Sequence, residues 1–162
     1  MEWTFRYATA RDLDRITEIE LICFPPEQAA TREAFAQRIA AFPTHFLLLE
    51  HNGTPIGFVN GAVFDARYIE DEMYERTDSH NEQGAFQSVF GLDVLPEYRG
   101  QGLAHKLMAQ LIAQARSEGR KGVTLTCLAE KIGFYETMGF KNEGVSASSH
   151  GGVVWYNMLL DF

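Results

Sequence analysis

The sequence has few cysteines and no long apolar run. Its 162 residues include only Cys23 and Cys127, far apart, so we expect two free, mostly buried thiols and no disulfide framework. No Cys/His group has the spacing of metal ligands, so we expect no metal. No apolar segment approaches the roughly 20 residues that cross a bilayer. The N-terminus lacks a basic region followed by an apolar one, so we expect a cytoplasmic protein with no membrane partner.

Positive charge is also scarce. The chain has 14 Lys and Arg against 22 Asp and Glu, for a net charge of −8. Unspecific binding to nucleic acid needs a basic surface, so nucleic acid is not an expected partner. The acidic balance is compatible with a cationic amine ligand, although most acidic proteins are simply soluble. The length and the 46% content of hydrophobic residues predict a single domain spanning residues 1–162.

The segment 86–115 predicts a strand, a tight turn and a helix. The apolar run from Val89 to Leu95 has the length of a strand and is closed by Pro96. Residues 99–102 form the turn, where two glycines let the backbone reverse sharply. Apolar residues then recur at helical spacing along one face: Leu103, Leu107, Met108, Leu111, Ile112 and Ala115. Because the first amides of a helix lack intrahelical partners, the turn predicts a phosphate-binding site.

Two common phosphate motifs are excluded here. The dinucleotide fingerprint G-x-G-x-x-G is absent, and no Gly-Lys-Ser/Thr follows to make a P-loop. The turn instead reads Arg99-Gly100-Gln101-Gly102-Leu103-Ala104, which resembles the acyl-CoA motif Arg/Gln-x-x-Gly-x-Gly/Ala of the GNAT acetyltransferase superfamily. Further on, residues 133–136 and 138–140 resemble the superfamily's "FYxxxGF" segment. The two motifs stand in the order and at the kind of distance that the superfamily shows.

The rest of the chain predicts the order β-α-α-β-β-loop-β-α-β-α-β-β. Strands are expected at 3–8, 45–50, 56–64, 123–128, 140–145 and 153–160, and helices at 13–23, from about 31 to before Pro43, and at 130–138. Asn52-Gly53 is a strong hairpin signal. The acidic stretch 65–84 predicts a short helix around 69–74 and a solvated loop. Hairpins mixed with crossovers predict an α/β (α+β) fold with a mixed central sheet flanked by helices, which matches the GNAT layout.

The resemblance implies an N-acetyltransferase that uses acetyl-CoA as its co-substrate. Within the superfamily the chain looks most like the arylalkylamine N-acetyltransferase type, because Cys23–Ala30 is similar to the loop that covers the amine pocket there. The resemblance implies that backbone groups of Leu92, Asp93 and Val94 receive the pantetheine arm like an added strand. It also implies that Tyr135 gives a proton to the leaving thiolate. The implied pyrophosphate contacts are Arg99, Gly100, Gln101, Gly102, Leu103, Ala104 and His105.

The sequence departs from the arylalkylamine type at its general base. The animal enzyme has a His-x-His pattern where this chain has Ser88 and Phe90, and neither side chain can accept a proton from an ammonium group. Another group, a chain of water molecules or an acceptor amine of low pKa would have to replace the histidines. The candidate bases are His150, His80 and Glu27. His150, which lies in a loop rich in Ser and Gly, is the first choice as a catalytic residue.

These observations together predict direct acyl transfer to the primary amine of a small molecule by a monomer or homodimer. Cys127 is disfavoured as a nucleophile because it stands in an apolar strand with no evident base. Two alternatives stay open. The acceptor could be a protein N-terminus, a polyamine or an amino acid. Alternatively, the chain could be a non-catalytic acyl-CoA-binding sensor, which the missing histidines favour.

Overall fold

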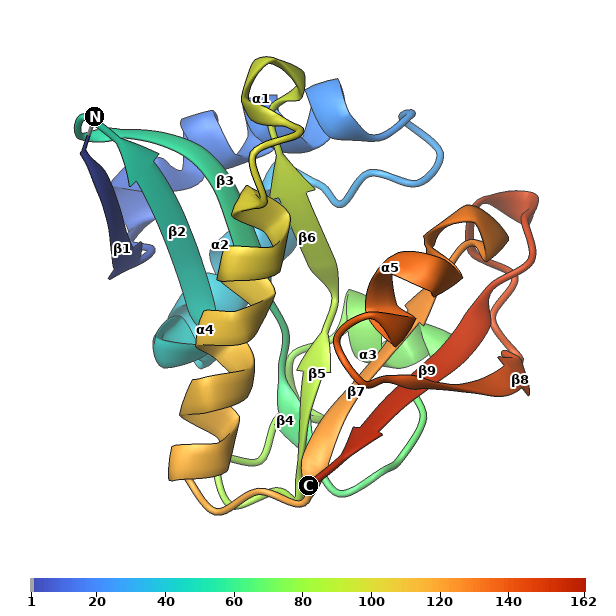
Figure 1. Cartoon of the computed structure of the whole chain (residues 1–162). Coiled ribbons are helices and arrows are strands. Elements are labelled where there is room, and N and C mark those ends of the chain that lie inside the picture. The colour runs from blue at the N-terminus through green and yellow to red at the C-terminus, as the bar shows by residue number, and fades with distance from the viewer. Residues whose placement is uncertain (1) are drawn as a thin grey trace. The chain divides into compact units, whose positions relative to one another are not determined.

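The computed structural model describes residues 2–162, which form two compact units (Figure 1). Unit 1 comprises residues 2–61 and 91–111, and unit 2 comprises residues 62–90 and 112–162. Each unit holds its own sheet. No helix in residues 2–162 is long and apolar enough to cross a membrane. The expectation of one domain over residues 1–162 stays a prediction.

Unit 1 is a four-stranded antiparallel sheet with helices on both faces. The strand order is β1-β2-β3-β6. Its elements are β1 (Trp3–Tyr7), α1 (Leu13–Cys23), α2 (Arg32–Ala41), β2 (Phe46–His51), β3 (Thr54–Asn60), β6 (Gly91–Val94) and the first part of α4 (Leu103–Ser117). The side chains of Val94 on β6 and Leu107 on α4 lie on the same side of Gly57 in β3. Helix α1 packs on β3 and β6. Figure 1 shows α4 on one side of this sheet, with α1 and α2 on the other.

Local sequence signals set the ends of the helices in unit 1. A capping box precedes α1, because the Thr9 N–H donates to Asp12 Oδ2 at 2.8 Å and the chain turns from there into α1. Pro25 and Pro26 follow the end of α1, where neither can continue a helix. The Thr31 hydroxyl accepts from the Ala34 N–H at 3.1 Å and caps α2. The helices predicted at 13–23 and from about 31 are confirmed.

Three phenylalanines form the centre of the core in unit 1. The ring centroids of Phe35 and Phe46 are 5.9 Å apart, and each lies 5.6 Å from the ring of Phe58. All three side chains are fully buried. Burying an aromatic side chain contributes on the order of 2–3 kcal/mol, so this cluster fixes α2 on β2 and β3.

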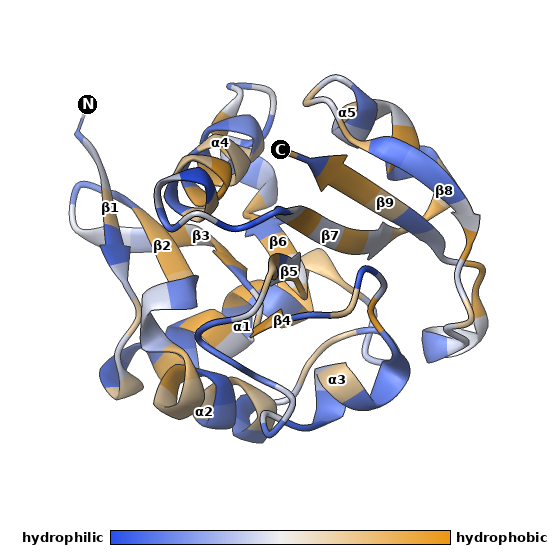
Figure 2. Ribbon diagram, turned by 90° about the horizontal axis from the view of Figure 1, so that it is seen from below, coloured by the Kyte–Doolittle hydropathy of each residue, from blue (hydrophilic) through white to orange (hydrophobic). Residues whose placement is uncertain are grey.

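Unit 2 holds a five-stranded mixed sheet of order β4-β5-β7-β9-β8. β5 and β7 are parallel, and the other neighbours are antiparallel. Its elements are β4 (Val63–Phe64), α3 (Asp71–Glu75), β5 (Phe86–Val89), β7 (Gly122–Cys127), α5 (Ile132–Glu136), β8 (Lys141–Val145) and β9 (Tyr156–Asp161). Hydrophobic residues run along β9, whereas α3 is largely hydrophilic (Figure 2). The predicted α/β class with mixed sheets and flanking helices is confirmed.

Three predicted strands differ from the observed ones. Segment 56–64 is divided into β3 and β4, and the apolar run 89–95 is divided at Phe90 between β5 and β6. The two halves of that run pair in different sheets, since β5 is parallel to β7 and β6 is antiparallel to β3. The last strand begins only at Tyr156, because a 3₁₀ turn with Gly151 at φ +68° precedes it. The 3₁₀ turns are Ala10–Asp12, Pro43–His45, Pro96–Tyr98, Ala129–Lys131 and His150–Gly152.

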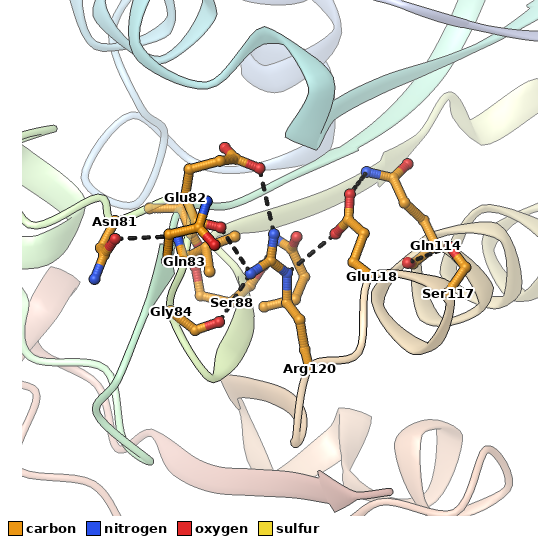
Figure 3. A network of polar contacts seen from close by, with 12 residues as sticks. Asn81, Glu82, Gln83, Gly84, Ser88, Gln114, Ser117, Glu118 and Arg120 are labelled. Carbon is orange, nitrogen blue, oxygen red and sulfur yellow. Dashed lines mark hydrogen bonds and ion pairs between the residues drawn. The ribbon is translucent and has the colours of Figure 1, made fainter.

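A buried arginine holds the end of the acidic connection in unit 2. Arg120 Nη1 donates to the carbonyl oxygens of Glu82 at 3.0 Å and Gly84 at 2.8 Å (Figure 3). Its Nη2 and Nε reach the carboxylates of Glu82 at 3.3 Å and Glu118 at 3.0 Å. Six of the seven acidic residues in 65–84 are exposed, which confirms the predicted solvated stretch. Arg120 therefore fixes the end of this stretch together with a local turn, in which the Gly84 N–H donates to the Asn81 carbonyl at 2.8 Å.

Candidate functional site

Strand β6 is one of the two edge strands of the sheet in unit 1, and some of its backbone groups point away from β3. The Leu95 N–H donates to the Ile56 carbonyl at 2.9 Å. In an antiparallel ladder alternate residues face the same neighbour, so the backbone groups of Asp93 also face β3. The backbone groups of Leu92 and Val94 therefore face the outer edge. An extended molecule with amide groups can add there like a further strand.

The carbonyl of Val94 already has partners in unit 1. It accepts from Arg99 Nε at 2.9 Å and from the thiol of Cys23 at 3.5 Å. Arg99 therefore folds back on β6 and fixes the start of the following turn. Of the three residues predicted to contact pantetheine, Leu92 presents both its N–H and its carbonyl outward, Val94 presents its N–H, and Asp93 directs its backbone toward β3.

The turn before α4 leaves a row of backbone amides open. Gly100 and Gly102 have φ of +81° and +77°, a region that favours glycine, and a Cβ on either would meet nothing within 4 Å among the described residues. The Lys106 N–H donates to the Gly102 carbonyl at 3.0 Å, so the amides of Leu103 to His105 come before the first full helical bond. Since α4 has 15 residues, its dipole adds to an anion site at this end.

Tyr135 lies in α5 of unit 2 and is fixed by aromatic contacts. Its side chain is buried, and its ring meets Phe134 and Phe140 edge-on at centroid distances of 5.0 Å and 5.7 Å. Gly139 has φ +96° and ends the helical segment, so that the Phe140 N–H returns to the Tyr135 carbonyl at 3.2 Å. The predicted motif is thus a closed helix and turn that orients one phenol, and a phenol is a proton donor at neutral pH.

His150 belongs to a group of rings in unit 2 that the sequence patterns did not predict. Its ring is stacked on Tyr74 at 6.4 Å and lies 6.1 Å from Trp155, while Tyr74 lies 4.9 Å from Phe90. We call Tyr74, Phe90, His150 and Trp155 the aromatic surface. His150 is exposed and the other three are half-buried. Its members come from α3, from the residue after β5 and from the connection before β9. They are therefore too far apart in the sequence for a helical or strand repeat to reveal them together.

Hydrogen bonds hold the aromatic surface in place. The hydroxyls of Tyr74 and Thr126 are 2.7 Å apart, and Trp155 Nε1 donates to the His150 carbonyl at 2.7 Å. The Ser148 hydroxyl donates to the carboxylate of Asp71, which ties the connection before β9 to α3. These bonds fix the side chains of Tyr74 and Trp155, between which the His150 ring lies.

Ser88, which stands where the animal enzyme has a histidine, and the other two candidate bases have different surroundings. Ser88 is buried, and its hydroxyl donates to a backbone carbonyl at 2.6 Å. His80 Nδ1 accepts from the Val63 N–H at 3.0 Å, and its Nε2 lies 3.1 Å from Glu82. Protonation of that Nδ1 would break the bond to Val63, so His80 is poorly suited to accept a proton. Glu27 is exposed in the connection after α1.

The two cysteines are unsuited to nucleophilic chemistry. Both are free thiols, Cys127 buried and Cys23 half-buried. Burial raises the pKa of the Cys127 thiol to about 11 and also raises the pKa of Cys23. Since the thiolate is the reactive form, neither residue is primed to attack a thioester.

Comparison with known families and proteins gives one strong match. The model of the acetyltransferase (GNAT) family matches residues 13–140. An uncharacterized N-acetyltransferase from Methanocaldococcus jannaschii is 30% identical over 103 residues, which are 62% of this chain and 40% of that protein. One from Gracilaria tenuistipitata var. liui is 32% identical over 69 residues, 43% of this chain and 36% of that protein. The chain thus spans less than half the length of either relative.

Solved structures share the fold at low sequence identity. The loading GNATL domain of CurA from Lyngbya majuscula superposes with a TM-score of 0.84 at 16% identity, covering 99% of this chain and 98% of that one. The ribosomal-protein-S18-alanine N-acetyltransferase from Escherichia coli gives a TM-score of 0.73 at 19% identity, covering 99% and 94%. Both cover nearly the whole chain.

Proposed function

Because the chain belongs to the acetyltransferase (GNAT) family, we propose that it transfers an acetyl group from acetyl-CoA to the primary amine of a small, arylalkylamine-like molecule. The observation that carries the acyl-CoA part is the outer edge of β6, followed directly by the open turn at Gly100 and Gly102. The outward backbone groups of Leu92 and Val94 suit the amides of pantetheine. The exposed amides at the start of α4 suit a pyrophosphate. These residues fit acyl-CoA as a co-substrate.

The aromatic surface supports an aromatic, cationic acceptor. Ring faces attract ammonium groups, and flat rings stack on other rings with little loss of conformational freedom. His150 and Trp155 are partly accessible, and Tyr74 is held by its bond to Thr126. The net charge of −8 also favours cations over anions near the protein.

The proposed reaction is a direct displacement. The neutral amine nitrogen attacks the thioester carbon, the N–C bond forms and the C–S bond breaks. A backbone N–H of β6 stabilises the charge that develops on the carbonyl oxygen. Tyr135 donates a proton to the CoA thiolate, and His150 accepts the proton that the nitrogen releases. No covalent enzyme intermediate forms, in agreement with the raised pKa of Cys127.

The first test is CoA thiol release from acetyl-CoA with a panel of amines. We expect release with arylalkylamines and little with polyamines, amino acids or short peptides. Faster release with a peptide would assign a protein N-terminus as the acceptor. No release with any amine, with acyl-CoA binding retained, would contradict the enzyme assignment and favour a sensor.

Tyr135→Phe tests the proposed acid. Phenylalanine keeps the ring contacts to Phe134 and Phe140, so the fold and the Kd for CoA should not change. Loss of a general acid lowers kcat by about 10²-fold or more. The matched control is Tyr68→Phe, which removes an exposed hydroxyl bonded to Glu143 at 3.3 Å and should leave kcat unchanged. Equal kcat in the two variants would remove Tyr135 from this role.

His150→Gln tests the proposed base. Glutamine keeps a polar side chain of similar size but cannot take up a proton. We expect kcat/KM to fall and to lose its decline toward acidic pH, because that decline reports protonation of the free base. If the variant keeps the acidic decline of the original protein, the proton goes to another group.

A further inference from the structure

Unit 1 buries two carboxyl groups and one guanidinium, which come from β6 and from the helices α1 and α2. Asp93 on β6 is 1% exposed, Glu20 on α1 is 6% exposed and Arg38 on α2 is 5% exposed. Buried charges are costly unless they are paired and hydrogen-bonded. Two ionised carboxylates and one guanidinium would leave one negative charge in excess at this place.

The hydrogen bonds satisfy only part of this cluster. Arg38 Nη1 donates to Asn60 Oδ1 at 3.1 Å, and Glu20 Oε2 accepts from the Ala30 N–H at 2.8 Å. Glu20 Oε1 and both carboxyl oxygens of Asp93 have no donor among the described protein atoms. Ionised carboxylates only accept hydrogen bonds, whereas a protonated carboxyl donates one. A single proton therefore lets one of the two groups donate to the other and removes the excess charge.

The groups that face Asp93 favour its protonated form. Burial raises the pKa of Asp93 well above its usual range, and the charge and hydrogen bonding of Glu20 raise it further. The thiol of Cys23, also on α1, acts in the same direction. Arg38 from α2 acts in the opposite direction, and Asn60 from β3 carries no charge.

We propose that Glu20 and Asp93 share one proton and that this pair positions β6 against the loop 24–31. The Ala30 N–H donates to the Glu20 carboxyl on α1, and α1 packs on β6, which carries Asp93. Leu92 and Val94, the two neighbours of Asp93, carry the backbone groups on the outer edge of β6. Glu20 and Asp93 are thus positioning residues, and their effect on catalysis rests on the proposed function of β6 as the acyl-CoA strand.

The pair makes the loop sensitive to rising pH. When the shared proton is lost, two neighbouring buried carboxylates face a single guanidinium and repel each other. The folded pKa of Asp93 lies above its unfolded value of about 3.8, so the contribution of its protonated form to stability is complete below that value and falls as pH rises through the folded pKa. Release of the loop should then follow, and the KM for acyl-CoA should rise.

Two measurements on the full chain without ligand test the pair directly. The ¹³C chemical shift of the Asp93 carboxyl, assigned with Asp93→Asn, should report a group that stays protonated above pH 3.8, the pKa of its unfolded form. The protection of the Ala30 amide against hydrogen exchange should fall at least tenfold, beyond the intrinsic pH effect, as Asp93 ionises. An Asp93 carboxyl that ionises at or below its unfolded pKa of about 3.8 would overturn the proposal, and this titration needs no variant that could fail to fold.

Glu20→Gln is the decisive variant. Its amide can donate to an ionised Asp93 and still accept from Ala30, so the loss of protection and the rise in KM with increasing pH should both disappear. Asp12→Asn is the matched control, because Asp12 is a buried carboxylate of the same unit paired with Arg6, and it should keep this pH-dependent step. A step that persists in Glu20→Gln refutes the positioning role. An exchange result as expected, with no turnover of any amine, would refute only the proposed function.

Discussion

Replacing Arg120 by Met should destabilise the protein by about 3 kcal/mol. Methionine keeps much of the apolar stem but removes all the donors that reach Glu82, Gly84 and Glu118 (Figure 3). The connection that leads into β5 would then lose the side chain that holds its end.

The magnitude follows from the surroundings of each partner. Gly84 is buried, so its carbonyl, left without this donor, costs about 1–3 kcal/mol. Glu82 is exposed and its carbonyl can bind water, which limits that loss to about 0.5–1 kcal/mol. The ion pairs with the partly exposed Glu82 and Glu118 carboxylates add about 0–1 kcal/mol. Arg120→Lys keeps a single cationic donor and should lose about half as much.

Urea denaturation at 25 °C measures the effect. With an m-value of about 2 kcal/mol/M, a loss of 3 kcal/mol moves the midpoint down by about 1.5 M. Arg76→Met is the control, because Arg76 forms an exposed ion pair with Asp78 and should change the free energy of unfolding by less than about 0.5 kcal/mol. A loss below about 1 kcal/mol for Arg120→Met, or equal losses for Met and Lys, would refute the reasoning.

Three further predictions concern single positions. Gly102→Asp places a carboxylate at the start of α4 and a side chain at φ +77°, so CoA affinity should fall at least tenfold in calorimetry; retained affinity would contradict the phosphate site. Gly57→Ala places a Cβ 2.5 Å from the Asp93 carbonyl and should cost about 1–3 kcal/mol in urea titrations, unlike Gly133→Ala, whose Cβ meets nothing. The hydrogen bond from Arg6 is the main cause that lowers the pKa of Asp12. The Asp12 carboxylate therefore contributes to stability above about pH 3.8, and this contribution is lost as pH falls further. Urea titrations from pH 6 to 3 should show the free-energy cost of Asp12→Asn shrinking.

Features that depend on neighbouring residues could be predicted from the sequence. The cap at Thr9, the cap at Thr31 and the glycine that ends α5 at Gly139 each act within a few residues, so their signals are local. The open turn at Gly102 is of the same kind. The helices predicted at 13–23 and from about 31 have the expected bounds, whereas the helix predicted at 130–138 is a 3₁₀ turn followed by α5 at Ile132–Glu136.

Features that depend on distant partners could not be predicted in this way. The break at Phe90 lies inside the largely apolar run 89–95, and only the pairing of β5 and β6 with different strands reveals it. The resemblance implied only that the backbone of Asp93 contacts pantetheine. No residue near Asp93 in the sequence indicates that its side chain is buried together with that of Glu20. Tyr74 and Trp155 meet His150 through the sheet order of unit 2, which hydrophobic periodicity does not encode.

The outer edge of β6 also bears on the lifetime of the protein. An edge strand is a template on which a second chain can pair, and such pairing leads to aggregation. A molecule that adds to that edge competes with self-association and stabilises the folded state by RT ln(1 + [L]/Kd), about 2.7 kcal/mol when its concentration is 100 times Kd. The supply of acyl-CoA would then control how much folded enzyme persists as well as how fast that enzyme works.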